Sequence, residues 1–363
     1  MTQVTRSAKV LFFLFYSVTF SFAQNTLGYT EADVFFRNGV ELFEKNNYAA
    51  SRQEFKMYIE KQANLLNTND YNAVSAEYYF ALSSLYLNYP DAETEVARFV
   101  KKHPEHPKSS QIFADLGVYY YDREDYAKAI SFFEKALGQN VNFYQATTNK
   151  YKLAMSYYMT QQTDKALPYF EELTRDASSQ YFAAANYYAG VINFKNEDYN
   201  RAVENFKRIE QVPQYKADIP NWISACLYRS KRYDDLLRYA EPILERAKAG
   251  GIKLNDVALY SAEVYYTRND YAKAAINYAL FNKFKAGAAP APILFRYGNS
   301  LFKSGNPKAA IDVLKSVSTR KDTIGQFSSY VLGISYLQEK NPTSALVAFD
   351  NASRLNLDRK STV

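Results

Sequence analysis

The feature that most constrains this chain is the stretch from Gln111 to Leu137, QIFADLGVYYYDREDYAKAISFFEKAL. Its apolar residues fall at helical spacing in two short runs, and Asp125 lies between the two runs. Asp125 is a good N-cap, because its carboxylate can accept hydrogen bonds from the unpaired N–H groups that open the second helix. The stretch therefore predicts two antiparallel helices joined by a tight turn.

Small residues in this stretch set how closely the two helices can cross. Gly117 in the first helix and Ala129 in the second leave room for the crossing, and Tyr120 and Phe133 fill the space beside them. An aromatic residue followed by Leu-Gly, Tyr, Ala, Phe and Ala at these offsets resembles a tetratricopeptide repeat. The resemblance implies a helix–turn–helix unit that must stack on further copies of itself, because one pair cannot bury its own apolar faces.

The same small residue recurs along the chain. With Gly117 as the anchor, equivalent positions follow one another at intervals of 34 to 42 residues, close to the period of this repeat. The other anchors are Gly39, Ala81, Ala154, Gly190, Ser224, Ala262, Gly298 and Gly333. A second small residue stands twelve positions after most anchors, and a large apolar residue stands four positions further. We therefore expect an all-α fold, a right-handed α-solenoid superhelix of about nine tetratricopeptide-like repeats.

Two repeats depart from this pattern in their second helix. Repeat two has Glu93 and Ala97 at the two offsets, and repeat six has Leu236 and Ala240. The helix boundaries of these two repeats are therefore not fixed by the sequence pattern. In six other repeats an Asn or Asp stands directly before the second helix and is predicted to be its N-cap: Asn47, Asp125, Asp198, Asp270, Asn306 and Asn341.

The first 23 residues have the pattern of a secretory signal peptide. Arg6 and Lys9 precede the apolar run 10–20, which is too short to span a bilayer. Ser21-Phe22-Ala23 then supplies small residues where a signal peptidase cleaves. A buried N-terminal helix is the alternative, but this order of features favours export.

Cleavage after Ala23 would leave a solenoid over residues 24–357 and a short tail over 358–363, with no transmembrane segment. Gln24 stands where a lipoprotein would have a cysteine, so no lipid anchor is expected. The mature protein should be periplasmic or secreted. Its only cysteine, Cys226, lies among apolar residues, which favours a buried thiol over a disulfide between chains.

Charge and residue types argue against several classes of function. Loss of Arg6 and Lys9 lowers the formal charge from +6 to +4, and the remaining cations are mixed with acids along the chain. A nucleic-acid-binding protein would need a basic stripe, and none is visible. The only two histidines, His103 and His106, lie in a proline-rich segment without other metal ligands nearby. We expect no catalytic residues, no metal and no cofactor, and therefore a protein that is not an enzyme.

The resemblance indicates where a partner would bind. In tetratricopeptide arrays the first helix of each pair lines a concave groove, and its fifth and twelfth repeat positions point inward. In this chain those positions are mostly aromatic, and they form the predicted partner-binding groove: Phe36, Phe43, Tyr78, Tyr121, Tyr151, Tyr158, Tyr187, Phe194, Tyr228, Tyr266, Phe295, Phe302 and Tyr330. The Lys and Asn residues with which some family members hold a terminal carboxylate are missing from these positions.

Two interpretations of these aromatic residues stay open. Each ring could pack on a neighbouring repeat and leave only its hydroxyl in water. Alternatively, an apolar stripe of this length marks a site for a peptide or a helix. The chain resembles exported bacterial scaffold proteins of envelope assemblies, which implies a protein partner. The second hypothesis is glycan or peptidoglycan binding, in which Asn221, Glu263 and Asn299 would supply hydrogen bonds.

The last repeat gives one more expectation. Its second helix is predicted from Pro342 to Leu355, and Leu346 and Val347 lie on a face that the next repeat would cover elsewhere in the array. We expect an uncovered apolar patch here. Either the natural protein is longer or this end associates with a second copy or a partner.

Overall fold

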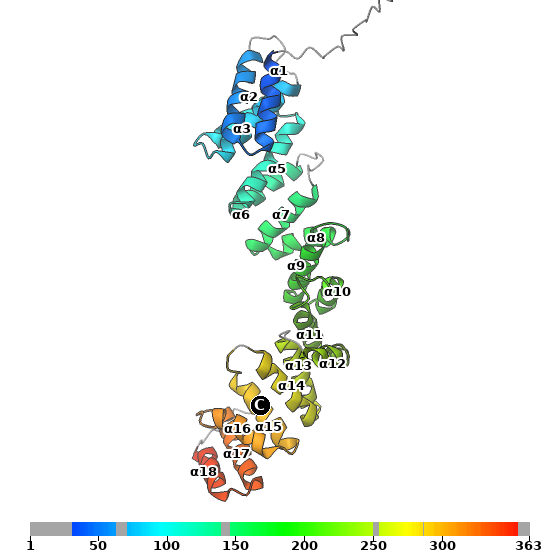
Figure 1. Cartoon of the computed structure of the whole chain (residues 1–363), viewed down its shortest axis with the longest axis vertical. Coiled ribbons are helices and arrows are strands. Elements are labelled where there is room, and N and C mark those ends of the chain that lie inside the picture. Colours follow the sequence, from blue (N-terminus) through cyan, green and yellow to red (C-terminus); the bar gives the residue numbers. More distant parts are fainter. Residues whose placement is uncertain (1–30, 63–70, 139–145, 250–253, 286, 355–363) are drawn as a thin grey trace, which may run out of the picture. The chain divides into compact units, whose positions relative to one another are not determined.

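The structure, a computed structural model, describes residues 31–62, 71–138, 146–249, 254–285 and 287–354. The predicted signal peptide and the tail 358–363 lie outside these residues. Within the described residues there are eighteen helices and no strand (Figure 1). The helices are α1 (Glu31–Glu44), α2 (Tyr48–Gln62), α3 (Tyr71–Tyr86), α4 (Ala92–Lys102), α5 (Pro107–Tyr121), α6 (Tyr126–Gly138), α7 (Ala146–Met159), α8 (Thr163–Leu173), α9 (Phe182–Lys195), α10 (Tyr199–Ile209), α11 (Ile219–Arg229), α12 (Tyr233–Ala249), α13 (Asn255–Thr267), α14 (Tyr271–Phe284), α15 (Ala291–Lys303), α16 (Pro307–Ser318), α17 (Thr323–Gln338) and α18 (Pro342–Arg354).

The turns inside the repeats share one backbone feature. In all nine helix pairs of the described chain, the residue seven positions after the anchor has a positive φ, between 57° and 84°. These residues are Asn46, Asn88, Glu124, Gln161, Glu197, Lys231, Asn269, Gly305 and Lys340. A single left-handed residue after a helix ends it and satisfies its last carbonyl groups. The predicted all-α solenoid of paired helices is therefore confirmed.

Side-chain caps begin most of the second helices. Asp125 Oδ1 accepts a hydrogen bond from the Lys128 amide at 3.2 Å, and Asp198 and Asp270 accept equivalent bonds at 3.2 and 3.1 Å. Asn306 and Asn341 do the same in repeats eight and nine, at 3.2 and 3.1 Å. These five N-caps were predicted from the sequence and are confirmed.

The small anchor residue lies directly against the large apolar residue sixteen positions later. A Cβ atom added to Gly190 would lie 2.6 Å from the ring of Phe206, and one added to Gly333 would lie 2.5 Å from Phe349. Gly39 has the same relation to Phe55. The two helices of a repeat therefore cross at the anchor, as the sequence predicts.

Repeat two departs from the spacing for a structural reason. Its second helix, α4, begins only at Ala92, and the buried residues are Ala92, Val96 and Phe99. Glu93 and Ala97, which the repeat spacing places at the crossing, are exposed. The helix begins eleven residues after its anchor, compared with nine in the other repeats, and Ala92 and Val96 are buried one position before the offsets of the repeat. The departure seen in the sequence of repeat two is therefore a change in this helix. In repeat six Leu236 and Ala240 do occupy the crossing and are fully buried.

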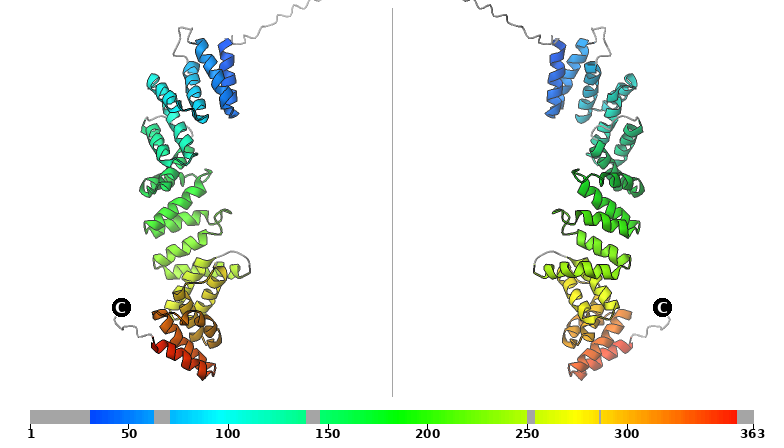
Figure 2. Two further views of the ribbon diagram at one scale, coloured as in Figure 1. Left: turned by 90° about the vertical axis from the view of Figure 1, so that its left-hand side faces the viewer. Right: turned by 90° about the vertical axis from the view of Figure 1, so that its right-hand side faces the viewer.

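The described chain divides into two compact units, and the division passes through α5 and α6. Unit 1 is Met1–Tyr119 with Glu134–Val141, and unit 2 is Tyr120–Phe133 with Asn142–Val363. In unit 1, a buried cluster forms around Phe55, Tyr58 and Ala76. Within unit 2, helix pairs follow one another in chain order from α8, in green, to α18, in red (Figure 2).

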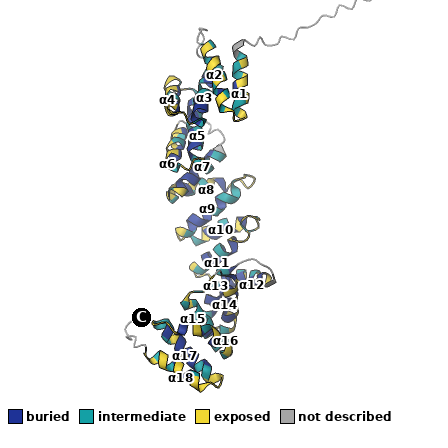
Figure 3. Ribbon diagram, turned by 60° about the vertical axis from the view of Figure 1, so that its left-hand side comes forward, coloured by how far each residue is buried: buried dark blue, intermediate teal, exposed yellow. Residues whose placement is uncertain are grey.

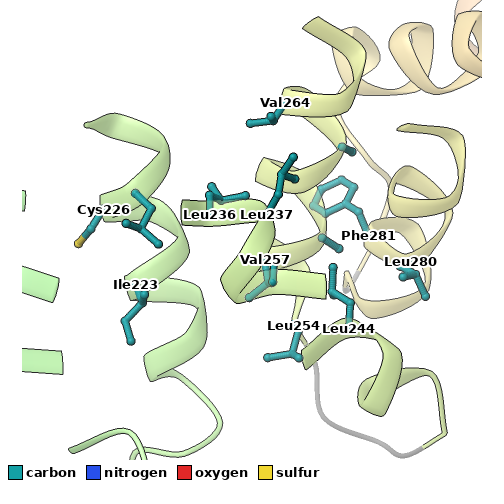
Figure 4. Close-up of a cluster of buried hydrophobic side chains, with 14 of the residues drawn as sticks. Ile223, Cys226, Leu236, Leu237, Leu244, Leu254, Val257, Val264, Leu280 and Phe281 are labelled. Atoms are coloured by element: carbon teal, nitrogen blue, oxygen red, sulfur yellow. The ribbon is translucent and has the colours of Figure 1, made fainter. Parts of the chain in front are cut away.

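Burial differs among the helices of unit 2. Half or more of the residues of α9 and α11 are buried, whereas α18 buries only Ala345 and Ala348 (Figure 3). One buried apolar cluster runs from α9 to α14 and includes Cys226, which is fully buried. Figure 4 shows Leu236 and Leu237 of α12 between Cys226 of α11 and Val264 of α13. Stability in this unit therefore comes from packing between neighbouring repeats.

Two single features complete the fold. Pro242 lies inside α12, and the helix continues through it to Ala249. Among the helices of the described residues, none combines the length and the apolar composition that crossing a bilayer would require.

Candidate functional site

The thirteen residues predicted to line the groove lie on first helices, but they differ in exposure. Tyr78 is almost completely buried, with 2% of its surface exposed, whereas Tyr330 is 53% exposed. The other eleven are partly buried. We call the thirteen residues the aromatic row. Its members therefore do not form one uniform binding surface.

Aromatic residues at the twelfth repeat position pack across the turn of their own repeat. Five of the seven such residues in the aromatic row contact the tyrosine that begins the second helix, five residues later, with ring centroids 5.2 to 5.8 Å apart. The pairs are Phe43–Tyr48, Tyr121–Tyr126, Phe194–Tyr199, Tyr228–Tyr233 and Tyr266–Tyr271. These rings hold the two helices together at the turn, so part of the aromatic row has a structural role.

Aromatic residues at the fifth position pack on the large residue at the helix crossing. Tyr151 meets Phe170 at 6.3 Å, and Tyr187 meets Phe206 at 6.4 Å, in both cases edge to face. In unit 1, Phe36 contacts Phe55 in the same way at 5.9 Å. One side of each ring is therefore committed to the core of its own repeat.

In repeats four and five the outer sides of these rings are also covered. Tyr181 stacks on Tyr151 with centroids 4.5 Å apart, and Tyr215 stacks on Tyr187 at 5.1 Å. Tyr188 contacts Tyr158 at 4.9 Å. We call these residues, Tyr151, Tyr158, Tyr181, Tyr187, Tyr188 and Tyr215, the tyrosine cluster. Stacked and edge-to-face rings stabilise each other, so the cluster is a packed structure.

The pKa values of tyrosines in and beside the cluster are raised, as expected for packed rings. Burial raises the pKa of Tyr121 to about 12, and the neighbouring hydroxyls of Tyr126 and Tyr188 add to the effect. The pKa of Tyr151 is raised further, first by burial and then by Tyr188 and Tyr121. Desolvation disfavours the charged phenolate, so these hydroxyl groups stay neutral far above physiological pH.

Sequence reasoning missed the residues that cover the row. Tyr188 and Trp222 lie two residues before an anchor, and each stacks on the crossing phenylalanine of the preceding repeat: Phe170 at 5.4 Å and Phe206 at 5.6 Å. An aromatic residue two positions before the anchor also occurs at Tyr79, which stacks on Phe55 at 5.2 Å. That recurring position was the available signal. Tyr181 and Tyr215 lie in connections between repeats, and each stands nine residues before the next anchor, Gly190 or Ser224.

Polar residues that could have served glycan binding are engaged within the protein. Asn221 Oδ1 accepts hydrogen bonds from the amides of Asp256 and Val257, at 3.1 and 3.3 Å. Asn299 Nδ2 donates to the hydroxyl of Tyr266 at 2.8 Å.

Glu263 is likewise engaged. Its carboxylate is 8% exposed, accepts a hydrogen bond from Tyr278 at 2.8 Å and pairs with Arg296. All three of these residues therefore already have internal partners.

Repeats eight and nine present the aromatic row differently. On α17, Phe327, Tyr330 and Leu337 are each about half exposed, at 49%, 53% and 51%. With the partly buried Ile334 they lie on one helical face, at relative positions 0, 3, 7 and 10. We call these four residues the α17 stripe. Phe295 of the adjacent α15 lies 6.3 Å from Phe327 and extends the apolar surface.

Open surface hollows lie away from the aromatic row. Within the described residues, a hollow of about 590 Å³ lies between α8 and α10, one of about 300 Å³ between α12 and α14, and one of about 250 Å³ beside Glu210 and Leu254. None of the three is lined by a residue of the aromatic row. No group of three or more His, Cys, Asp or Glu side chains in the described chain is placed to hold a metal ion.

Unit 1 contains a separate buried polar pair. The hydroxyl of Tyr78 donates a hydrogen bond to Asp115 Oδ2 at 2.5 Å, and Lys108 Nζ lies 4.4 Å from the centre of the Tyr78 ring. Burial raises the pKa of Asp115 to about 6, although the Tyr78 hydrogen bond and the Lys108 charge act in the opposite direction. Tyr78 is therefore part of the interior, and we leave it out of the binding surface proposed below.

Comparison with known proteins identifies the repeat. The family described as "Tetratricopeptide repeat" matches residues 87–142 and 151–216. Among solved structures, the C-terminal part of a TPR repeat-containing protein from Cytophaga hutchinsonii is 16% identical, with a TM-score of 0.48, over 68% of this chain and 97% of that one.

A tetratricopeptide repeat protein from Parabacteroides merdae is also 16% identical, with a TM-score of 0.37, over 71% and 98% of the two chains. No curated protein matches this chain.

Proposed function

Because this chain is a tetratricopeptide-repeat protein, we propose that it is a non-enzymatic scaffold that binds a protein partner on the first helices of unit 2. The α17 stripe carries this proposal. Apolar patches of this kind on a folded protein usually mark an interaction site, because exposing them to water is unfavourable. The regular spacing of the stripe suits a partner helix or an extended peptide that places apolar side chains between Phe327, Tyr330 and Leu337.

The tyrosine cluster belongs to the proposed surface only at its edges. The rings of Tyr151 and Tyr187 are each packed against at least two other rings, so a partner would contact mainly hydroxyl groups and ring edges there. We therefore expect most of the binding energy from repeats eight and nine. Phe295, Phe302 and Tyr330 are the residues of the aromatic row that we retain as principal contacts.

The remaining parts of the proposal concern location and ligand class. The signal-like segment supports export, with the partner in the periplasm or outside the cell. Glycan binding through stacked tyrosines is the alternative. It loses support because Asn221, Glu263 and Asn299, which would have bound sugar hydroxyls, already have partners within the protein.

The test uses the intact chain with Phe327, Tyr330 and Leu337 changed together to serine. These side chains are half exposed, so helicity should change little, whereas capture of a partner from the envelope fraction should be lost. A photo-crosslinking residue at position 330 should form an adduct with the same partner. Digestion of glycans in the fraction should leave capture unchanged.

A matched control changes exposed apolar residues elsewhere. Val34, Met57 and Ile276, which are 37% to 52% exposed, should be replaceable by serine without loss of capture. Capture that survives the α17 changes would contradict the proposed site. Capture that disappears with glycan digestion would favour the alternative ligand class.

We also propose self-association through α18. Its side chains Leu346 and Val347 are 71% and 59% exposed, which makes them the most exposed pair of neighbouring large apolar residues in the described chain. A second copy that covered them would bury two branched side chains, and this contact would lie on a different helix from the α17 stripe.

A further inference from the structure

Cations recur at one position of the aromatic row in unit 2. Lys195, Arg229 and Lys303 are the last residues of α9, α11 and α15, and each stands five residues after its anchor. Each directly follows a member of the aromatic row: Phe194, Tyr228 and Phe302. All three cations are exposed, and none has a carboxylate partner within the described residues.

A helix C-terminus attracts cations by itself, because the helix dipole places negative partial charge there. The charges around these three residues provide the independent observation. At the same offset in repeat three stands Asp122, but Lys152 Nζ pairs with it at 2.7 Å. The buried Glu263 is similarly neutralised by Arg296. These two acids are therefore paired internally, whereas Lys195, Arg229 and Lys303 have no carboxylate partner within the described residues. Lys195 Nζ lies 5.6 Å from the centre of the Tyr158 ring.

From this pattern we infer the chemistry of the partner: a peptide segment in which carboxylates alternate with aromatic or aliphatic side chains. The inference rests on the proposed function, and it adds the charge of the ligand. Apolar side chains of the segment contact Phe302 and the α17 stripe, while its Asp or Glu residues approach Lys195, Arg229 and Lys303. Carboxylates are attracted to these positions by the exposed cations.

The geometry sets an approximate spacing for the carboxylates. Packed helices lie about 8–10 Å apart, and an extended chain rises about 3.3 Å per residue. First helices of neighbouring repeats contact each other, as α11 and α13 do. A segment that crosses them would therefore advance about three residues per repeat. Acids that meet Lys195 and Arg229 should be about three residues apart in the partner.

The experiment is a selection from a display library of random twelve-residue peptides on the intact protein. We expect recovered peptides to be rich in Asp and Glu next to Phe, Leu or Ile. Binding of one such synthetic peptide, measured by fluorescence anisotropy, should weaken about tenfold in the variant Lys195→Glu, Arg229→Glu, Lys303→Glu, since three exposed ion pairs are lost. It should also weaken between 50 and 500 mM salt.

The control reverses three exposed cations on second helices of the same unit: Lys207→Glu on α10, Lys283→Glu on α14 and Lys308→Glu on α16. This variant has the same net charge, so a general electrostatic effect would weaken both variants equally and would overturn the inference. Circular dichroism checks folding, and glutamine replaces glutamate at the three test positions if reversal disturbs it.

The outcomes separate the two proposals. Peptides without acids that lose binding when Phe327, Tyr330 and Leu337 are changed to serine would overturn the acidic partner but retain the proposed function. Failure to select any peptide, or selection of peptides indifferent to both sets of changes, would overturn both.

Discussion

The tyrosine cluster of repeats four and five and the α17 stripe of repeat nine are built on the same repeat positions, yet one is packed and the other is exposed. Tyr151 and Tyr330 both occupy the fifth position, and both contact the crossing phenylalanine of their own repeat, at 6.3 and 6.1 Å. Tyr151 then receives Tyr181 as a stacked neighbour. Tyr330 has no stacked ring within the described residues.

This difference shows that the repeat position alone does not decide function. The fifth position directs a ring toward the same side of each first helix, but a second ring from the following connection decides whether that ring is available. Where the connection supplies a tyrosine, as before α9 and α11, the ring of the aromatic row is packed beneath it and has a structural role. Where it supplies none, the row remains a surface that a partner can use.

The largest expected effect is on stability. It tests whether removing the phenylalanine at the helix crossing destabilises the packed repeat five more than the exposed repeat nine. Phe206 is fully buried and contacts Gly190, Tyr187 and Trp222. Phe206→Ala should cost about 3–5 kcal/mol. Phe349→Ala, at the same position of the last repeat, should cost less because Phe349 is only partly buried.

Hydrogen exchange locates these losses. Protection should fall first in α9 to α12 for Phe206→Ala, since repeats couple mainly to their neighbours. Uniform loss across all helices would show that the array does not behave as stacked repeats.

The next largest effect is expected at alkaline pH, which should destabilise the region of packed tyrosines more than the region of exposed ones. The pKa of Tyr121 in the folded state, about 12, lies above the ordinary value of 10, so the folded state favours the neutral phenol. This contribution is fully present below pH 10 and is lost as pH rises from 10 to 12, by about 1–3 kcal/mol. Changing Tyr121, Tyr151 and Tyr188 to phenylalanine should therefore preserve helicity to higher pH.

Circular dichroism, together with absorbance of the phenolate, measures this transition. A control in which the exposed residues Tyr71, Tyr89 and Tyr330 are changed to phenylalanine should unfold as the parent does. Equal protection by both triple variants would argue against special packing of the tyrosines in repeats three to five.

A smaller effect is expected at the turns. Gly305 is the only glycine among the nine left-handed turn residues of the described chain. Gly305→Ala should destabilise repeat eight by about 1 kcal/mol, because a Cβ atom disfavours positive φ. Glu197→Gly, at the equivalent turn of the packed region, should have the opposite sign in thermal denaturation. A loss of stability on both changes would mean that contacts of the Glu197 side chain outweigh its backbone strain.

The smallest change in stability is expected for Leu346→Glu with Val347→Glu, within about 0.5 kcal/mol, because both side chains are exposed. Light scattering at several concentrations should nevertheless show that the parent associates and that the variant stays monomeric. A parent that is monomeric at every concentration would remove the proposal of self-association through α18 and leave the α17 stripe as the only proposed contact.

Much of the fold could be predicted from local pattern. The anchors predicted the helix crossings, and five capping residues predicted the starts of second helices, since both depend on residues close in sequence. Repeat two departs from the pattern because α4 begins two residues later than the other second helices and buries residues one position earlier, which periodicity alone does not show.

The candidate site was less predictable. Tyr151 and Tyr187 are covered by tyrosines of the connections that follow their repeats, and this depends on the conformation of those connections. Glu263 is paired with Arg296, which belongs to the next repeat. These are contacts between repeats, and the spacing of one repeat does not contain them. Exposure of the α17 stripe likewise depends on contacts between repeats, because within the described residues no ring stacks on Tyr330.

The recurrent left-handed residue has a consequence for protein engineering. Anchor spacing varies from 34 to 42 residues, yet the left-handed residue always follows its anchor by seven. Length variation is therefore absorbed after that residue: in the second helices, which have 11 to 17 residues, in the turn of repeat two and in the connections between repeats. A reporter peptide or a fluorescent domain should be tolerated in a connection such as residues 175–180, whereas one extra residue between Gly190 and Glu197 would disrupt the helix pair.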